Sequence, residues 1–158
     1  PPFKRNTPLV FQEYALFPHM TVYENISYGL KLSKTPKEEM DRRVQEMLKM
    51  FNLVGLEKRF PKEMSGGQQQ RVAIARAIAT KPPIIMADEP TGALDYKTGK
   101  QVLALLQRTC RETGRTVIVI THNTALTAMA DRVIQVKSGQ ILSNKVNEHP
   151  VPVEQIEW

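Results

Sequence analysis

Two adjacent carboxylates follow a short apolar segment near the middle of the sequence. Ile84-Ile85-Met86-Ala87 is a continuous apolar run, and Asp88-Glu89-Pro90 comes directly after it. Burying carboxylates costs free energy unless a cation binds them or hydrogen bonds stabilise them. One carboxylate could therefore hold Mg²⁺, directly or through water, while the other polarises an attacking water. The alternative is that the pair lies in a loop or caps a helix.

A serine and two glycines form a second segment with possible chemistry. Ser65-Gly66-Gly67-Gln68 precedes a helical pattern that we expect to continue to about Ala79. Glycines let backbone N–H groups approach a ligand closely, and the positive end of the helix dipole lies at the same point. Ser65 could donate a hydrogen bond to a phosphate oxygen. A plain serine cap with a glycine-rich entry is the alternative.

A histidine follows the second predicted strand. Residues 117–120 are expected to form a buried strand, and Thr121-His122 comes directly after it. Ligands bind at the carboxyl ends of strands in open α/β sheets, which makes His122 a candidate site residue. A buried structural histidine is the alternative. His19 and His149 have no such context and are expected at the surface.

The elements that must position these residues alternate along the chain. From residue 65 onward the order is helix, strand, helix, strand, helix, strand, with residues 98–113 and about 123–130 as the second and third helices. This order predicts an α/β fold with a parallel sheet, and the apolar run at 84–87 suits a strand buried on both faces. Residues 133–136 and 141–142 flank a predicted hairpin turn.

Residues 21–64 contribute helices but no clear strand, and we interpret them as a helical subdomain inserted beside the sheet. Two capping boxes are expected to start its helices: Thr21 with Glu24, and Thr35 with Glu38. In the second box, Pro36 would occupy the favoured first helical position. One apolar stripe at helical spacing follows: Met40, Val44, Met47, Leu48 and Phe51.

Composition excludes several classes of protein. The chain has 158 residues, of which 41% are hydrophobic and 24% charged, as in an ordinary globular domain. The single cysteine, Cys110, excludes an intramolecular disulfide and a cysteine-based zinc site, and no transmembrane helix or signal peptide is expected. The net charge of +6 could suit nucleic acids, nucleotides or a membrane surface. Because the basic residues form no tail or block, we expect a solvated mixed surface.

The candidate segments lie in one stretch that resembles a known family. From Met64 to Asp95 the sequence reads MSGGQQQRVAIARAIATKPPIIMADEPTGALD. It resembles the ATP-binding cassette (ABC) transporter ATPases, with their signature motif, Walker B segment and D-loop in order. Val10-Phe11-Gln12-Glu13-Tyr14 resembles the Q-loop and His122 the switch histidine. The resemblance covers residues 1–142 and five motifs in the right order and spacing.

The resemblance implies a P-loop NTPase-like parallel sheet, here a partial core, with a helical subdomain that carries the signature motif. Residues 1–158 would form a partial nucleotide-binding domain: Q-loop and helical subdomain at about 13–64, the other motifs at 65–142 and an extended tail at 143–158. Two such cassettes, identical or different, would face each other, trap ATP with Mg²⁺ and work with transmembrane permease subunits. No nucleic-acid partner is expected.

The resemblance also implies a role for each matching residue. Asp88 would help hold Mg²⁺, Glu89 would act as general base on the hydrolytic water, and His122 would contact the γ-phosphate and that water. Gln12 would reach the Mg²⁺ and sense the transport subunit. The remaining residues, in the signature motif and the D-loop, would contact nucleotide across the dimer or organise that contact: Ser65, Gly66, Gly67, Gln68 and Asp95.

One motif of the family is missing from these residues. A Walker A loop reads G-x-x-x-x-G-K-[ST], and the only Gly-Lys pair, Gly99-Lys100, is followed by Gln101 and has Leu94 where the first glycine belongs. The chain therefore resembles the C-terminal part of a cassette. The 158-residue chain alone is expected to be inactive, and the complete protein to be an ATPase.

The resemblance points to a peripheral ATPase on the cytoplasmic face of the cell membrane. The N-terminal portion is similar to importers of polyamines, sugars or oxyanions, and the C-terminal portion to lipoprotein-release and macrolide-export cassettes, so export is slightly favoured. The alternatives are a soluble ABC-type ATPase of DNA repair or translation, and a non-catalytic fragment. In transporters of the family, one region forms much of the groove that accepts a helix of the membrane subunit, and here it is a dense apolar and aromatic stretch at a proline-containing loop: Phe11, Tyr14, Leu16, Phe17 and Met20. We therefore expect some exposed apolar surface there; the alternative is that all of these residues pack into the helical subdomain.

Overall fold

The computed structural model describes residues 9–10, 15–92 and 94–158. The chain forms two compact units, Pro1–Ile120 and Thr121–Trp158. Gln12 and two residues of the predicted docking stretch, Phe11 and Tyr14, lie outside the described residues.

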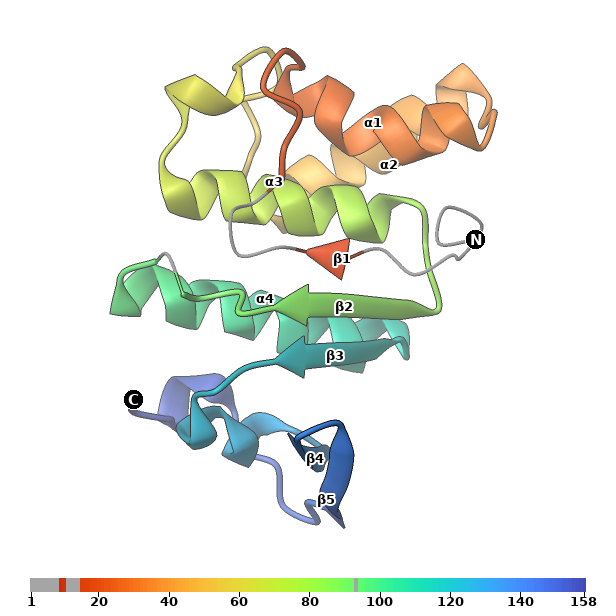
Figure 1. Ribbon diagram of the computed structural model, residues 1–158. Coiled ribbons are helices and arrows are strands. Elements are labelled where there is room, and N and C mark those ends of the chain that lie inside the picture. Colours follow the sequence, from red (N-terminus) through yellow and green to blue (C-terminus); the bar gives the residue numbers. More distant parts are fainter. Residues whose placement is uncertain (1–8, 11–14, 93) are drawn as a thin grey trace. The chain divides into compact units, whose positions relative to one another are not determined.

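A three-stranded parallel sheet forms the centre of the first unit, as the alternating pattern predicts. Its strands are β1 (Leu9–Val10), β2 (Ile84–Asp88) and β3 (Thr116–Ile120), in the order β1-β2-β3. The register of β2 and β3 pairs Ile84 with Thr116 and Asp88 with Ile120, so both strands end level with each other. The α/β fold class is confirmed, and the carboxyl ends of the strands meet at one edge of the sheet (Figure 1).

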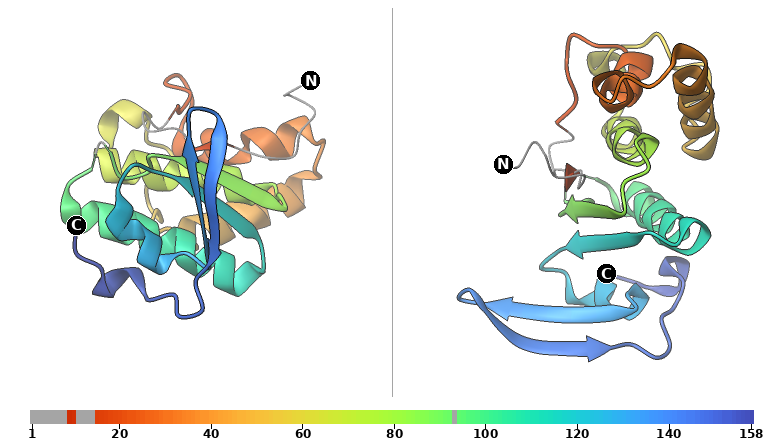
Figure 2. Two further views of the ribbon diagram at one scale, coloured as in Figure 1. Left: turned by 60° about the horizontal axis from the view of Figure 1, so that its bottom comes forward. Right: turned by 90° about the vertical axis from the view of Figure 1, so that its right-hand side faces the viewer.

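Helix α4 (Tyr96–Thr113) connects β2 to β3 and lies on one side of both strands (Figure 2). Gly114 ends it in a left-handed conformation with φ of +65°, as expected for a helix that closes on glycine. Because β2 ends at Asp88 and α4 begins at Tyr96, the short connection places the start of α4 at the same edge of the sheet as the end of β2 (Figure 1). The helix start is therefore close to the candidate carboxylates in the chain and in space.

Strand β3 differs from the sequence expectation, because it is not buried. Ile118 and Ile120 are 41% and 44% exposed, whereas Val117 and Val119 are half-buried. Side chains alternate between the two faces of a strand, and α4 packs on β3 from one face. β2 also alternates: Ile85 and Ala87 are buried and the other residues half-buried. An apolar run alone does not reveal how many faces of a strand are covered.

Three helices form the layer beside the sheet: α1 (Val22–Leu32), α2 (Lys37–Met50) and α3 (Gly66–Ala79). α3 lies between the sheet and the other two helices (Figures 1 and 2). The predicted box at the start of α1 is present, since the Thr21 hydroxyl accepts the Glu24 N–H at 3.3 Å and the Glu24 carboxylate accepts the Thr21 N–H at 2.8 Å. A short 3-10 turn, η2 (Pro61–Glu63), leads into α3.

The predicted box at the start of α2 is wrong. Pro36, with ψ of 144°, is the capping residue rather than the first helical residue, and no side chain caps the helix. Its carbonyl accepts the first helical bond, from the Met40 N–H at 2.9 Å. Thr35 therefore lies one residue too early to cap. The apolar stripe is confirmed, because all of its residues are buried: Met40, Val44, Met47, Leu48 and Phe51.

The second unit is built around a β-hairpin, as predicted. β4 (Arg132–Lys137) and β5 (Gln140–Val146) pair antiparallel, and Ser138 and Gly139 turn the chain with φ of +50° and +75°. Positive φ at both central residues is typical of the tight hairpin turn. Residues 143–146 complete β5, so the predicted extended tail is partly strand. The predicted short helix at about 123–130 is present as a 3-10 helix, η3 (Thr124–Met129), and a second 3-10 helix, η4 (Val153–Gln155), follows later.

Candidate functional site

The two carboxylates lie at the carboxyl edge of the parallel sheet. Asp88 is the last residue of β2, and Glu89 is the first residue beyond it; both are half-buried. Glu89 has φ of +43°, a left-handed conformation that is uncommon for a residue with a side chain. Its N–H donates to the carbonyl of Ile120 at the end of β3, at 2.9 Å. The backbone of Glu89 is thus tied to the neighbouring strand, and strained residues of this kind concentrate at functional sites.

The chain between Glu89 and α4 is a hydrogen-bonded turn. The Gly92 N–H donates to the Glu89 carbonyl and the Leu94 N–H to the Thr91 carbonyl, both at 3.0 Å. Asp95 then caps α4 by accepting the Thr98 N–H at 3.0 Å. Hydrogen bonds from Thr98 hold the pKa of the Asp95 carboxyl below its usual value. Asp95 therefore has a local role as a helix cap, and its role in a dimer contact stays a prediction.

The signature segment starts α3 with a reciprocal cap. The Ser65 hydroxyl accepts the Gln68 N–H at 3.3 Å, and the Gln68 side-chain oxygen accepts the Ser65 N–H at 2.9 Å. The prediction that Ser65 caps the helix is therefore confirmed. It does not exclude a ligand role, because Ser65 is exposed and a hydroxyl that accepts one hydrogen bond still has its own proton to donate.

Gly67 is required by packing between helices. It is buried, and a Cβ placed on it would lie 2.2 Å from the Thr98 Cγ2 in the first turn of α4. Only a residue without a side chain allows this close approach. The N-terminal turns of α3 and α4 are thereby held against each other, so the signature segment and the residues that follow Asp95 form one cluster.

Gln70 joins α3 to the turn that runs from Asp88 and Glu89 to the start of α4, here called the carboxylate turn. The sequence analysis did not identify Gln70 as a site residue. The side chain is completely buried, and its Nε2 donates to the carbonyl of Pro90 at 2.9 Å. Pro90 directly follows Glu89. The signal in the sequence is a glutamine at helical spacing with apolar residues, since Gln70, Ile74 and Ile78 follow one another at intervals of four and all three are buried.

Two further predicted site residues do not belong to the described part of the first unit. Gln12 lies outside the described residues. His122 belongs to the second unit and is exposed, which rules out the buried structural alternative. Its predicted contact with nucleotide stays a prediction.

The segment after the predicted Q-loop is ordered around one buried asparagine. Asn25 accepts the Phe17 N–H at 2.9 Å, and its Nδ2 lies 3.1 to 3.2 Å from the carbonyls of Phe17, Met20 and Thr21. The Phe17 ring lies 5.3 Å from the Arg76 guanidinium of α3, a cation–π distance. Burial holds the pKa of Arg76 below its usual value. Phe17, Leu16 and Met20 are half-buried, so part of their apolar surface is accessible.

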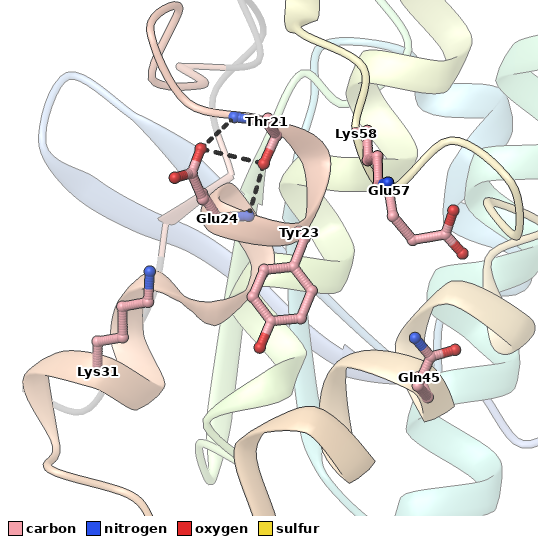
Figure 3. Close-up of a pocket in the computed structure, with 7 residues that line it drawn as sticks. All are labelled: Thr21, Tyr23, Glu24, Lys31, Gln45, Glu57 and Lys58. Carbon is pink, nitrogen blue, oxygen red and sulfur yellow. Dashed lines mark hydrogen bonds between the residues drawn. The ribbon is translucent and has the colours of Figure 1, made fainter. Parts of the chain in front are cut away.

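A pocket of about 430 Å³ lies in the helical layer (Figure 3). Its walls come from α1, α2 and the loop after α2: Thr21, Tyr23, Glu24, Lys31, Gln45, Glu57 and Lys58. Burial and the neighbouring Asp41, to which the Tyr23 hydroxyl donates a hydrogen bond, raise the pKa of Tyr23 to about 12. None of the predicted site residues lines this pocket.

The carboxylate turn suits a magnesium–nucleotide complex better than a cage for a bare metal ion. Within residues 9–10, 15–92 and 94–158, no group of three or more His, Cys, Asp or Glu side chains is placed to hold a metal. Mg²⁺ commonly takes only one or two protein carboxylates and fills its other positions with phosphate oxygens and water. Asp88 and Glu89 provide that number at the sheet edge, so the residues present fit Mg²⁺ bound to a nucleotide.

Comparison with known proteins identifies the family. A family model described as "ABC transporter" matches residues 1–92, more than half of the chain. The chain belongs to the ABC transporter family. This agrees with the resemblance in the signature, Walker B and D-loop segments. In the described part of this ABC chain no helix is long and apolar enough to cross a membrane.

Curated relatives of this ABC chain are import subunits by name. A spermidine/putrescine import ATP-binding protein PotA from Acidothermus cellulolyticus is 50% identical over 143 residues, which cover 89% of this chain and 37% of the relative. A sulfate/thiosulfate import ATP-binding protein, CysA 1 from Agrobacterium fabrum, is 48% identical over 143 residues and is covered to 41%. The chain thus spans about two-fifths of the length of these relatives.

Solved ABC structures share the fold. The ATP-binding cassette MJ0796, in a dimeric post-hydrolysis state bound to ADP and Pi, superposes with a TM-score of 0.76 at 40% identity. The match covers 90% of this chain and 63% of that cassette. A second dimeric structure of MJ0796, described as a bacterial ABC transporter cassette, also gives a TM-score of 0.76, at 41% identity. The P-loop NTPase type of fold is therefore confirmed.

Proposed function

We propose that the complete protein is the ATP-hydrolysing subunit of an ABC importer. The observation that carries the proposal is the cluster at the sheet edge, where the carboxylate turn, the start of α4 and the signature helix α3 are joined by Gly67, Thr98 and Gln70. The names of the relatives support import, and import replaces the slight preference for export that the C-terminal portion of the sequence suggested.

In the proposed reaction, Glu89 accepts a proton from the water that attacks the γ-phosphate. A general base must be positioned before its pKa matters, and the strand-anchored backbone of Glu89 provides that position. Asp88 would hold Mg²⁺, directly or through water. When bound, Mg²⁺ would neutralise the charge that develops on the transferred phosphoryl group.

The signature residues would act on the nucleotide of a facing cassette. Ser65 is exposed at the start of α3, with Gly66 and Gly67 in the first turn. The first N–H groups of a helix have no partner within it and bind anions together with the helix dipole. Gln12, His122 and Asp95 are proposed to complete the site, as the family resemblance implies. The dimeric MJ0796 structures support this two-cassette arrangement.

The proposed cargo is a small charged solute, with a polyamine favoured because most of the relatives compared are named as spermidine/putrescine importers. Selection of the cargo would fall to the membrane subunits. The ATPase would sit on the cytoplasmic face of the membrane as a peripheral subunit.

A reconstituted system tests the direction of transport. The complete protein is assembled with its membrane subunits in vesicles so that the ATPase subunit is outside, and labelled putrescine is placed either inside or outside. An importer should export label from such inverted vesicles only when Mg-ATP is added outside, because the cytoplasmic side then faces the bath. ATP-driven accumulation inside the vesicles would show an exporter and overturn the proposal.

Docking of the membrane subunit is expected at Phe17. The Phe17→Ala change removes an aromatic surface, and we expect about 30-fold weaker association, because truncation of an aromatic residue at the centre of an interface costs about 2 kcal/mol. Co-purification of the membrane subunits measures this. Phe60→Ala is the matched control, since Phe60 is 36% exposed in the loop before α3. Equal association of both variants, with unchanged thermal stability, would place the docking surface elsewhere.

A further inference from the structure

Helix α3 carries a buried polar side chain, Gln70, to which the roles of the signature residues Ser65 to Gln68 do not extend. Gln70 lies five positions after Ser65 and is completely buried, yet its side chain reaches out of the helix to the Pro90 carbonyl. We propose that Gln70 is a positioning residue, which holds the Glu89-Pro90 turn in place and couples it to the signature end of α3. The coupling to catalysis rests on the proposed function, in which Glu89 is the base.

The hydrogen-bond inventory of Gln70 favours a positioning role over a stabilising one. Its Oε1 is buried and has no hydrogen-bond partner within the described part of the chain. A buried acceptor without a partner lowers stability, whereas an apolar side chain of the same shape can be nearly neutral. The free energy of unfolding alone therefore does not explain why residue 70 is a glutamine and not a leucine. The hydrogen bond to Pro90 is the one interaction that leucine cannot replace.

The turn is held from two sides. The Glu89 N–H donates to the Ile120 carbonyl of β3 at 2.9 Å, and the carbonyl of the following residue, Pro90, accepts a hydrogen bond from Gln70 of α3 at 2.9 Å. With a rise of about 1.5 Å per residue, five positions place Ser65 about 7.5 Å along α3 from Gln70. A shift of α3 along its axis would therefore pull on Pro90 directly, next to the residue that carries the carboxylate.

This arrangement gives α3 a role in both nucleotide sites of a dimer. Its first turn would contact the nucleotide of the facing cassette, while Gln70 holds the base that serves the cassette's own nucleotide. A signature segment that moves when the dimer closes would bring the base with it. This connection through the Gln70 side chain adds to the packing of Gly67 against Thr98, which joins α3 to the start of α4.

The structural part of the proposal is tested by hydrogen exchange in the complete protein. In Gln70→Leu, amides in the peptide covering residues 89–94 should exchange about tenfold faster or more, because the turn loses one of its two anchors. Gln69→Leu is the matched control: the Gln69 Nε2 donates to the Met64 carbonyl and makes no bond to the turn. Equal exchange at residues 89–94 in both variants, at equal thermal stability, would overturn the proposal.

The functional part is tested by steady-state ATP hydrolysis. Gln70→Leu should lower kcat by about 10- to 100-fold with little change in KM, since a misplaced reacting group affects the chemical step. Gln70→Glu adds a readout that a purely structural role would not move. A buried carboxyl has a raised pKa, so this variant can donate to Pro90 only when protonated. Its kcat relative to the parent should therefore rise as pH falls; a flat ratio would count against the hydrogen bond.

The two failures are distinguishable. If exchange at residues 89–94 rises in Gln70→Leu but Glu89→Gln retains normal hydrolysis, then the link exists and the assignment of Glu89 as base is wrong. If Glu89→Gln is inactive but Gln70→Leu has normal exchange and normal kcat, then the proposed function stands and the positioning role of Gln70 is wrong.

Discussion

Glu89→Gln should yield a protein that binds ATP with near-normal affinity and hydrolyses it at least about 100-fold more slowly, because general base catalysis contributes about 10²–10⁴-fold. Glutamine keeps the size and the hydrogen-bonding oxygen of the side chain but cannot accept the proton. The backbone contact from residue 89 to Ile120 does not depend on the side chain, so the turn should remain in place. Nucleotide binding by fluorescence and phosphate release measure the two quantities separately.

The matched control for this experiment is Glu46→Gln. Glu46 lies on the surface of α2 in an exposed ion pair with Arg42, so the same chemical change there should leave hydrolysis unchanged. Near-normal turnover in Glu89→Gln would remove Glu89 from the role of base. A loss of ATP binding together with turnover would indicate that the carboxylate holds the magnesium complex rather than the water.

Gly67→Ala should destabilise the protein by about 1–3 kcal/mol, the usual cost of adding a methyl group to a closely packed contact. The added Cβ would lie 2.2 Å from the Thr98 Cγ2, so α3 or the first turn of α4 must move. Because Thr98 donates its N–H to Asp95 and Gln70 holds Pro90, this movement should also disturb the carboxylate turn. Denaturant unfolding of the complete protein and its ATPase rate measure the two effects.

A second substitution tests the cause. Thr98→Ser removes the Cγ2 methyl group but keeps the hydroxyl and the backbone cap, so in combination with Gly67→Ala it should restore most of the lost stability. The two effects would then be strongly non-additive, as expected for groups in direct contact. Additive losses would mean that the methyl contact is not what requires glycine at position 67, and would favour a direct role of the glycine in ligand binding.

Local signals in the sequence predicted most elements of the fold correctly. The box of Thr21 with Glu24 and the stripe from Met40 to Phe51 each depend on residues within a few turns of one another. The box at Thr35 failed because Pro36 adopts an extended ψ of 144° and takes the capping position itself. The prediction that β3 is buried was wrong, because burial depends on what packs on each face of the strand. The residues of the strand do not specify this.

For the candidate site, the sequence by itself determined the chemical groups: carboxylates after one strand, a capped glycine-rich helix start, and the family to which they belong. The chemical groups and the family follow from residue types at fixed spacing, because such motifs are defined by spacing along the chain alone. Only the tertiary structure decided which of these groups are joined. Gln70 lies 20 residues before Pro90, and Gly67 lies 31 before Thr98. Contacts over such distances arise when α3 and α4 pack, and helix packing is a property of surfaces that come together only in the folded chain.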